Sequence, residues 1–355
     1  MTSIDRNLLA ELGWNASLAE AFASLYDTTL TPARIAVDYG HRFLIETADG
    51  PIEALLGSHL HLGGRLAVGD WVAVRSQMGS ARIEHLLPRR TAISRKAADS
   101  AVDEQVLAAN VDVILLATAL GPDFNLRRIE RLLTVAYQSG ASPVILLTKA
   151  DLEDPSSYEV QLDAVAAGVP IISVSTLIGE GIDAVKDQLP MGRTGVIIGS
   201  SGVGKSTLIN RLVGDQVLRT SAVHAGGQGR HTTSHRQLIR IPNAGLIIDT
   251  PGLREIQLWA GEDALGQAFS DIEEFALQCR FNDCHHQQEP DCAVRLAIED
   301  GSLDQRRFDS YRKLQRELRS IEVRADARLR LEERRKWKVI HRAATERMKV
   351  KRRGM

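Results

Sequence analysis

The stretch TGVIIGSSGVGKSTLINRLVG, residues 194–214, decides how the rest of the chain is interpreted. A short apolar run leads into a glycine-rich turn that fits the pattern G-x-x-x-x-G-K-[ST], and an amphipathic run follows. This order predicts a buried strand, a phosphate-binding loop and a helix. Glycines let the backbone approach phosphate closely, and the helix N-terminus offers unpaired N–H groups and the positive end of its dipole. We expect the loop to consist of Gly199, Ser200, Ser201, Gly202, Val203, Gly204, Lys205, Ser206 and Thr207.

Two side chains of this loop have expected roles in catalysis. Lys205 would bridge the β- and γ-phosphates of a nucleoside triphosphate, and Ser206 would be a ligand of the accompanying Mg²⁺. The loop alone does not select the base. It therefore predicts a nucleotide-binding protein without separating ATP from GTP.

Around the loop, continuous apolar segments alternate with amphipathic ones from about residue 96 to 260. The apolar segments are VDVILLATAL (111–120), SPVILLTKA (142–150), VPIISVS (169–175) and AGLIIDTPGL (244–253). Strands that are apolar throughout are typical of a parallel sheet covered by helices on both faces. The pattern therefore predicts an α/β nucleotide-binding domain.

Short polar motifs follow these predicted strands, at the sheet edge where such folds bind ligands. In TKAD, the Asp151 carboxylate can accept two N–H bonds from guanine, and the stem of Lys149 can lie over the base. Thr148 replaces the usual Asn of this motif. In DTPG, Asp249 can hold the Mg²⁺ shell, and the Gly252 N–H can sense the γ-phosphate. The residues expected to contact GTP outside the phosphate loop are Thr148, Lys149, Ala150, Asp151, Ser173, Val174, Ser175, Asp249 and Gly252, with backbone N–H groups of 173–175 facing guanine O6.

The order of these motifs is unusual. The guanine motifs at 148–151 and 173–175 precede the phosphate loop at 199–207, whereas in ordinary GTPases they follow it. A sheet can form from a chain whose ends have been joined and reopened elsewhere. We therefore interpret the domain as a circularly permuted P-loop G domain.

The segments before this domain have a different character. Residues 1–32 have apolar residues at roughly helical spacing, and residues 33–95 contain several short alternating stretches separated by glycine-containing turns. Short strands within about 60 residues suit a small five-stranded barrel of the oligonucleotide-binding type. A small barrel that serves only as a spacer is the alternative.

All three cysteines of the chain lie close together after the G domain. Cys279-x₄-Cys284-x-His286-x₅-Cys292 offers three thiolates and one imidazole, a set that suits tetrahedral Zn²⁺. Four protein ligands leave no open position, so we interpret the site as structural. His285 is the alternative to His286. Reduced cysteines without metal, or an iron–sulfur cluster, remain the other interpretations.

Composition limits the cellular setting. The 355 residues are 44% hydrophobic and 25% charged, and no apolar run is long enough to cross a bilayer. The first residues do not have the pattern of a secretory signal, so we expect a cytoplasmic protein that does not bind membranes. Residues 321–355 contain 13 Lys or Arg and five acids. Such a tail indicates either a contact with a polyanion or a solvated charged helix.

With these motifs together, the chain resembles the ribosome small-subunit-dependent GTPase A family, circularly permuted GTPases of bacterial ribosome assembly. The matching segments are TKAD, GSSGVGKST, GGQGRHTTSHRQL (226–238), DTPGLRE (249–255) and the Cys/His spacing. The resemblance covers nearly the whole chain. It implies that the barrel binds RNA, and that the protein joins the 30S subunit and its 16S rRNA late in maturation. It further implies that the protein leaves after hydrolysing GTP to GDP, stimulated by the subunit.

The resemblance also assigns the first switch loop to residues 226–238. Thr232 or Thr233 would then reach Mg²⁺. Leu253 occupies the position where common GTPases carry a glutamine that orients the attacking water, so the site needs another polar group. The resemblance suggests His231 as the catalytic residue.

We therefore predict a monomeric, multi-domain α/β protein with five segments. They are a helical extension (1–32), an oligonucleotide-binding-like barrel (33–95), a circularly permuted GTPase domain (96–260), a helical zinc-binding domain (261–320) and a basic helical tail (321–355). The alternatives are a P-loop ATPase or kinase with an unrelated zinc finger, an RNA chaperone with a relic nucleotide site, and a GTPase that delivers metal.

Overall fold

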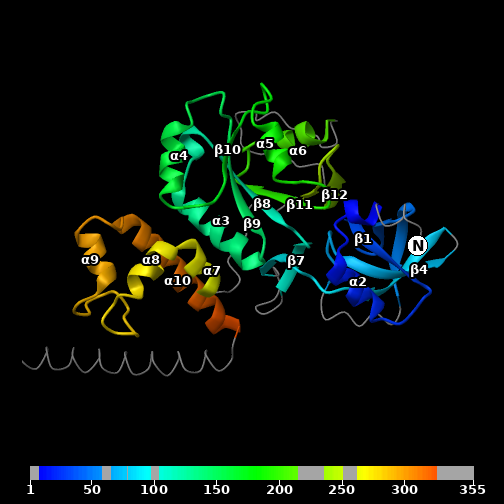
Figure 1. Cartoon of the computed structure of the whole chain (residues 1–355), viewed down its shortest axis with the longest axis horizontal. Coiled ribbons are helices and arrows are strands. Elements are labelled where there is room, and N and C mark those ends of the chain that lie inside the picture. The colour runs from blue at the N-terminus through cyan, green and yellow to red at the C-terminus, as the bar shows by residue number, and fades with distance from the viewer. Residues whose placement is uncertain are drawn as a thin grey trace, which may run out of the picture.

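A computed structural model describes residues 8–57, 65–77, 79–96, 104–214, 236–250 and 262–325 of the chain. Figure 1 shows three bodies in a row: a barrel formed by the N-terminal part, a central α/β domain, and a cluster of helices near the C-terminus. This arrangement confirms the predicted multi-domain α/β architecture.

Five strands form a closed barrel. Strand β1 pairs with β2 on one side and with β4 on the other, and the remaining strands complete the circle in the order β2-β3-β5-β4. Alternate residues of these strands fill the interior, among them Ile35, Ile45, Val74 and Ile83. The strands are β1 (Leu30–Asp38), β2 (Phe43–Thr47), β3 (Gly50–Leu56), β4 (Trp71–Gln77) and β5 (Ser80–Leu86). The preceding helix α2 (Ala16–Ala23) belongs to a lead-in that packs on the barrel, where Trp14 meets Trp71 edge to face.

The central domain is built on a sheet with the order β10-β9-β8-β11-β13-β12. All neighbouring strands are parallel except the edge pair β12–β13. These strands are β8 (Val113–Ala119), β9 (Ser142–Thr148), β10 (Ile171–Val174), β11 (Thr194–Gly199), β12 (Gln237–Arg240) and β13 (Leu246–Asp249).

Helices cover both faces of this sheet, which explains why its strands are apolar throughout. On one face, β8 residues such as Leu116 pack with α3 (Leu126–Ser139) and with the C-terminal helices. On the other, Leu115 packs with α5 (Ile182–Asp187) and α6 (Lys205–Val213). Two further elements belong to this domain: η1 (Gly121–Asp123) follows β8, and α4 (Ser156–Asp163) follows β9.

The strand order shows the circular permutation directly. The phosphate-loop strand β11 lies between β8, which precedes it in the chain, and β13, which follows it. The strands after the phosphate loop thus form one half of the sheet, and those before it form the other half. If the chain began at β11 and re-entered at β8, the same sheet would form, because the pairings do not depend on where the chain begins.

The C-terminal helices pack against helix α3 of the central domain. They are α7 (Glu262–Ala268), α8 (Ser270–Ala276), α9 (Ala293–Glu299) and α10 (Gln305–Ala325). Arg307 on α10 is bonded to Glu130 on α3 at 3.1 Å and to Asp271 on α8 at 2.6 Å, and it lies over the Phe269 ring. This largely buried group of charges fixes the helical region to the central domain.

A buried arginine joins the barrel to the central domain. The Arg34 side chain, 1% exposed, donates to the carbonyls of Leu12, Gly69 and Asn110 and to the hydroxyl of Thr194 at the start of β11. Burial lowers its pKa to about 10, which leaves it charged at neutral pH. Four segments that are distant in sequence therefore meet at one cation.

The two sheets are also continuous through one strand pair. Val37 of β1 lies opposite Gln237 of β12, so the barrel and the central sheet form a single run of strands. A separate hairpin of β6 (Ala92–Lys96) and β7 (Glu104–Ala109) connects the barrel to β8.

The predicted segment boundaries differ slightly from the ends of the elements. Strand β1 begins at Leu30, before the predicted barrel start at 33, and α10 continues to Ala325, past the predicted boundary at 320. Most of the basic tail and the first seven residues lie outside the described residues. Within the described part of the chain, no helix combines the length and apolar character needed to cross a bilayer.

Candidate nucleotide site and metal centre

The phosphate loop has the conformation that its glycines predict. It leaves β11 at Gly199 and enters α6 at Lys205, with Gly202 and Gly204 in the left-handed region at φ +79° and +102°. A Cβ on Gly199 would lie 2.3 Å from the Ala117 carbonyl oxygen of β8. Glycine is thus required at three points, twice for backbone conformation and once for close packing.

The ammonium group of Lys205 is held within the loop itself. Its Nζ donates to the carbonyl oxygens of Gly199 at 2.9 Å and Ser200 at 2.6 Å. The positive charge therefore lies at the mouth of the loop, next to the N-terminus of α6. Ser206 and Thr207 occupy the following positions of the same first turn.

Thr148 ties the guanine motif to the phosphate loop. Its hydroxyl donates to the Val203 carbonyl at 2.8 Å and lies 3.4 Å from the Thr118 carbonyl. The side chain is buried, so this bond is protected from water. Threonine thus supplies the polar connection for which the motif commonly uses asparagine.

Asp151 is oriented by a neighbouring strand. The Ser175 hydroxyl, at the end of β10 (Ile171–Val174), donates to its Oδ1 at 2.5 Å. The Ala150 N–H donates to the Val174 carbonyl at 3.2 Å, and Lys149 adopts φ +59°. The left-handed residue turns the chain sharply at the strand end, and the Asp151 that follows is exposed.

The backbone N–H groups predicted to face guanine O6 lie at and just after the end of β10. The N–H of Ser175 donates to the Glu180 carbonyl at 3.1 Å, so it is already bonded within its own loop. The Ser173 side chain points elsewhere, because its hydroxyl donates to Glu159 at 2.8 Å. The next backbone N–H along this loop belongs to Thr176, which the sequence pattern alone did not single out.

Asp249 ends β13 next to the phosphate loop. Burial raises the pKa of its carboxyl, and the charge of nearby Lys205 offsets part of that effect. Three predicted residues of the first switch loop, His231, Thr232 and Thr233, and Gly252 of the DTPG motif lie outside the described residues.

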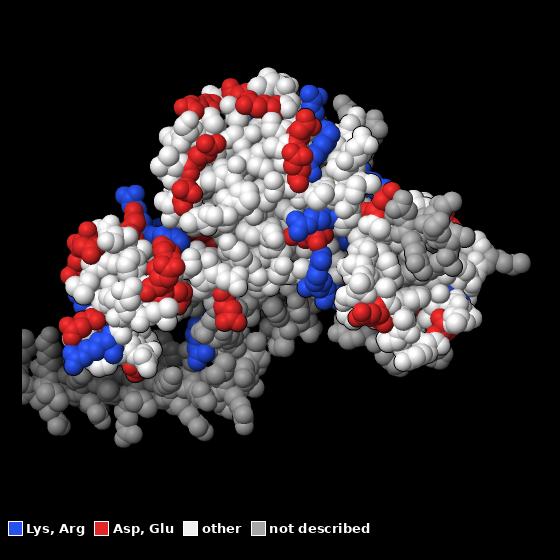
Figure 2. Space-filling view, viewed as in Figure 1, with Lys and Arg blue, Asp and Glu red and all other residues white. Residues whose placement is uncertain are grey.

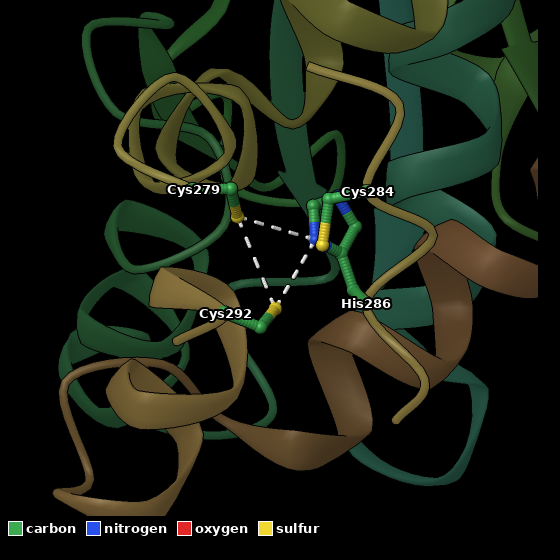
Figure 3. Close-up of side chains that lie close together, drawn as sticks. All are labelled: Cys279, Cys284, His286 and Cys292. Atoms are coloured by element: carbon green, nitrogen blue, oxygen red, sulfur yellow. Dashed lines mark hydrogen bonds between the residues drawn. The ribbon is translucent and has the colours of Figure 1, made fainter. Parts of the chain in front are cut away.

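The four predicted metal ligands form one compact cluster. The ligand atoms of Cys279, Cys284, His286 and Cys292 all lie within 4.8 Å of one another (Figure 3). The sulfur of Cys279 is 3.9 Å from that of Cys292, and His286 Nδ1 is 3.6 Å and 3.4 Å from those two atoms. A tetrahedral zinc ion requires separations of about 3.8 Å between sulfurs and about 3.6 Å between sulfur and nitrogen. The separations among Cys279, His286 and Cys292 are close to these values, and the Cys284 sulfur lies within 4.8 Å of the other ligand atoms, so the cluster is compatible with zinc.

The charge properties of the cluster also suit a cation. Desolvation raises the pKa of Cys284 to about 11, whereas at Cys279 hydrogen bonds outweigh desolvation and lower the pKa. Burial lowers the pKa of His286, which favours the neutral ring that a metal needs. Three thiols this close ionise together only if a positive ion balances them. His285, the alternative ligand, is exposed and donates its N–H to Glu289.

Comparisons with known proteins agree with this geometry. A family model described as RsgA GTPase matches residues 86–259. The small ribosomal subunit biogenesis GTPase RsgA of Opitutus terrae is 44% identical over 360 residues, which cover 96% of this chain and 98% of the relative. Its counterpart in Streptomyces avermitilis is 43% identical, over 93% of this chain and 91% of the relative.

Solved structures give the same result for the fold. The crystal structure of YjeQ from Thermotoga maritima has a TM-score of 0.63 and 26% identity, covering 81% of this chain and 98% of its own. YloQ, described as a circularly permuted GTPase, has a TM-score of 0.62 at 22% identity, over 82% of this chain and 96% of its own, a likeness in fold. The full-length similarity confirms the predicted resemblance, and the chain belongs to the RsgA GTPase family.

Proposed function

We propose that this protein is a GTP hydrolase of small-subunit biogenesis. It binds the 30S ribosomal subunit late in maturation, hydrolyses GTP to GDP and phosphate with stimulation by the subunit, and then dissociates. The observation that carries the proposal is the pair of hydrogen bonds by which Thr148 connects the guanine motif to the phosphate loop and Ser175 orients Asp151. The names of the full-length relatives supply the ribosomal partner.

The proposed nucleotide contacts follow the strand ends. The loop 199–207 surrounds the phosphates, with Lys205 on the β- and γ-phosphates and Ser206 on Mg²⁺, joined by Thr232 or Thr233. Asp151 accepts the two N–H bonds of guanine. Because the Ser175 N–H is already bonded to Glu180, we assign guanine O6 to the N–H of Thr176.

The proposed catalysis depends on a polar group outside the phosphate loop. Leu253 cannot orient water, so we assign that role to His231 of the first switch loop. His231→Ala should lower subunit-stimulated hydrolysis by about 100-fold or more. GTP affinity and binding to the subunit should stay the same, because His231 is not expected to hold the nucleotide. Equal stimulated turnover of the variant and the wild type, measured as phosphate release, would reject this assignment.

The proposed contacts with 16S rRNA involve the barrel and the basic tail. Figure 2 shows Lys and Arg side chains gathered where the central domain meets the barrel. Arg90, which links these parts through Asp112, keeps 59% of its side chain exposed. Neutralising rRNA phosphates makes such binding fall steeply with salt. The protein acts as a monomer in the cytoplasm, where its proposed partner is assembled.

The proposed metal is one structural zinc ion. Cys279, Cys284, His286 and Cys292 would hold it, and the bound ion cross-links the loop between α8 and α9. All four positions are protein ligands, which favours a fixed ion over a cargo. Metal release coupled to GTP turnover would support the alternative of a metal-delivery GTPase.

Co-sedimentation with purified small subunits tests the proposed cycle. The protein should sediment with the subunit in the presence of a non-hydrolysable GTP analogue, and should stay in the supernatant with GDP. Lys205→Ala provides the control, because it removes the phosphate contact that distinguishes the two nucleotides. Subunit binding that is equal with the analogue, with GDP and without nucleotide would contradict the proposal.

A further inference from the structure

A carboxylate outside every recognised motif contacts the phosphate loop. The Ser200 hydroxyl donates to Asp123 Oδ2 at 2.6 Å. Asp123 ends the short turn η1 (Gly121–Asp123) that follows β8, so it is 77 residues away in sequence but next to the loop in space. Ser200 is one of the variable positions of the loop pattern, and the pattern assigns its side chain no function.

An anionic side chain beside a polyphosphate site would oppose binding unless its charge were balanced. Asp123 Oδ1 lies 3.0 Å from the Arg128 guanidinium, and that guanidinium also donates to the Asp123 backbone carbonyl. The pair is neutral overall and lies at the N-terminus of α3. Asp123 therefore acts on the loop as a hydrogen-bond acceptor more than as a charge.

Ser200 connects Asp123 to the ammonium group of Lys205. The backbone carbonyl of the same serine accepts a hydrogen bond from Lys205 Nζ at 2.6 Å. Gly199 is held by its packing on β8, and Val203 is held by Thr148. Among these fixed points of the loop, only the position of Ser200 depends on the hydrogen bond of its own side chain.

We propose that Asp123 is a positioning residue for the phosphate loop. It holds Ser200, and through the Ser200 carbonyl it places the Lys205 charge where the β-phosphate and its neighbours bind. The proposal rests on the proposed binding of guanine nucleotides and names one determinant of their affinity. It affects GDP and GTP alike and leaves the choice of base unchanged, because the guanine motif lies on other strands.

A double-mutant cycle tests the proposal with fluorescent GDP and a fluorescent non-hydrolysable GTP analogue. Ser200→Ala should weaken both by about fivefold to tenfold, the loss expected for one ordinary hydrogen bond. Asp123→Asn should have a smaller effect, because an amide oxygen can still accept the bond. The double variant should bind no more weakly than Ser200→Ala alone, because the change at position 123 can act on the loop only through the hydroxyl that Ser200→Ala has already removed.

Three further measurements separate positioning from general damage to the fold. Ser200→Thr keeps the hydroxyl and should restore most of the affinity. The ratio of GTP to ATP affinity should stay at the wild-type value in Ser200→Ala. Ser156→Ala is the matched control, because Ser156 donates to Asp154 at 2.8 Å on the exposed start of α4 and should have no effect on binding.

The outcomes are distinct. If the wild type binds both nucleotides and Ser200→Ala binds them equally well, Asp123 has no positioning role. Fully additive losses in the double variant would also overturn the proposal. A wild type that binds neither guanine nucleotide would contradict the proposed function, and this inference with it.

Discussion

The nucleotide site and the metal cluster obtain their geometry in different ways: the first from contacts between distant segments, the second from one short segment. At the nucleotide site, functional groups of the described residues lie at the ends of parallel strands and are held by a neighbouring strand or the turn after it, as Ser175 holds Asp151 and Asp123 holds Ser200. The metal ligands come from a 14-residue stretch of loops and helix ends between Cys279 and Cys292. The pairing of the strands therefore determines the geometry of the nucleotide site, whereas the geometry of the cluster depends on its own four ligands.

The comparison predicts its largest effect at the metal cluster. His286→Ala should remove bound zinc, from about one ion per chain to almost none, because the remaining three ligands do not complete a tetrahedron. The segment between α8 and α9 should then become sensitive to protease. His285→Ala is the matched control, since the exposed neighbour is outside the cluster. The metal content of both purified variants shows which histidine is the fourth ligand. Retained zinc in His286→Ala would contradict the assignment.

The next largest effect should come from the buried charges that join the C-terminal helices to α3. Arg307→Ala leaves the carboxylate of Glu130, 3% exposed, without its cation, and should lower the free energy of unfolding by about 3 kcal/mol. The exposed pair of Arg295 and Glu299 provides the control, because Arg295→Ala should cost about 0.5 kcal/mol or less. Denaturant unfolding measures both. Equal losses in the two variants would mean that the buried charges do not fix the helical region.

Changes in the guanine motif should alter the preference for the nucleotide base without altering the fold. Asp151→Asn should lower GTP affinity by about 100-fold and favour xanthosine triphosphate, because the amide can donate to the extra carbonyl of xanthine. The unfolding transition should stay at the wild-type temperature. Asp154→Asn, a nearby carboxyl on the surface, should bind GTP as the wild type does. Unchanged base preference in Asp151→Asn would remove Asp151 from the guanine site.

The smallest effect concerns pH and the buried Glu130. Burial raises the pKa of this carboxyl, and Ser310 and Arg307 offset part of that rise. The unfolded chain therefore loses its proton at lower pH than the native protein does, and native stability falls as pH rises through that window. Glu130→Gln lacks this titration, so its stability relative to the wild type should increase as the pH rises above the ordinary pKa of a glutamate. A difference that stays constant with pH would show that burial does not govern this group.

The sequence was sufficient for the parts of the site that depend on backbone pattern. The glycines of the phosphate loop, the apolar strands and the Cys/His spacing each have one common structural interpretation, and the structure contains the strand, the parallel sheet and the compact Cys/His group that these patterns describe. The permutation was also visible, because motif order is a property of sequence. His286 was separated from His285 only in three dimensions, where one ring points into the cluster and its neighbour is exposed.

Other features could not be predicted because they depend on contacts between distant segments. Nothing near Arg34 in sequence indicates that its side chain will join Leu12, Gly69, Asn110 and Thr194. Asp123 follows a strand as any turn residue might, and its contact with the phosphate loop arises from the pairing of β8 with β11. The bond from Ser175 to Glu180, which moves the proposed O6 contact to Thr176, is likewise set by loop closure.

The central claim is that the circularly permuted G domain hydrolyses GTP in response to the small ribosomal subunit. Phosphate release from GTP and from ATP, each with and without purified 30S subunits, tests it most directly. We predict a large increase with the subunit for GTP only. Equal, slow release from GTP with and without subunits would contradict the ribosomal function and leave a permuted guanine-nucleotide fold without an assigned partner.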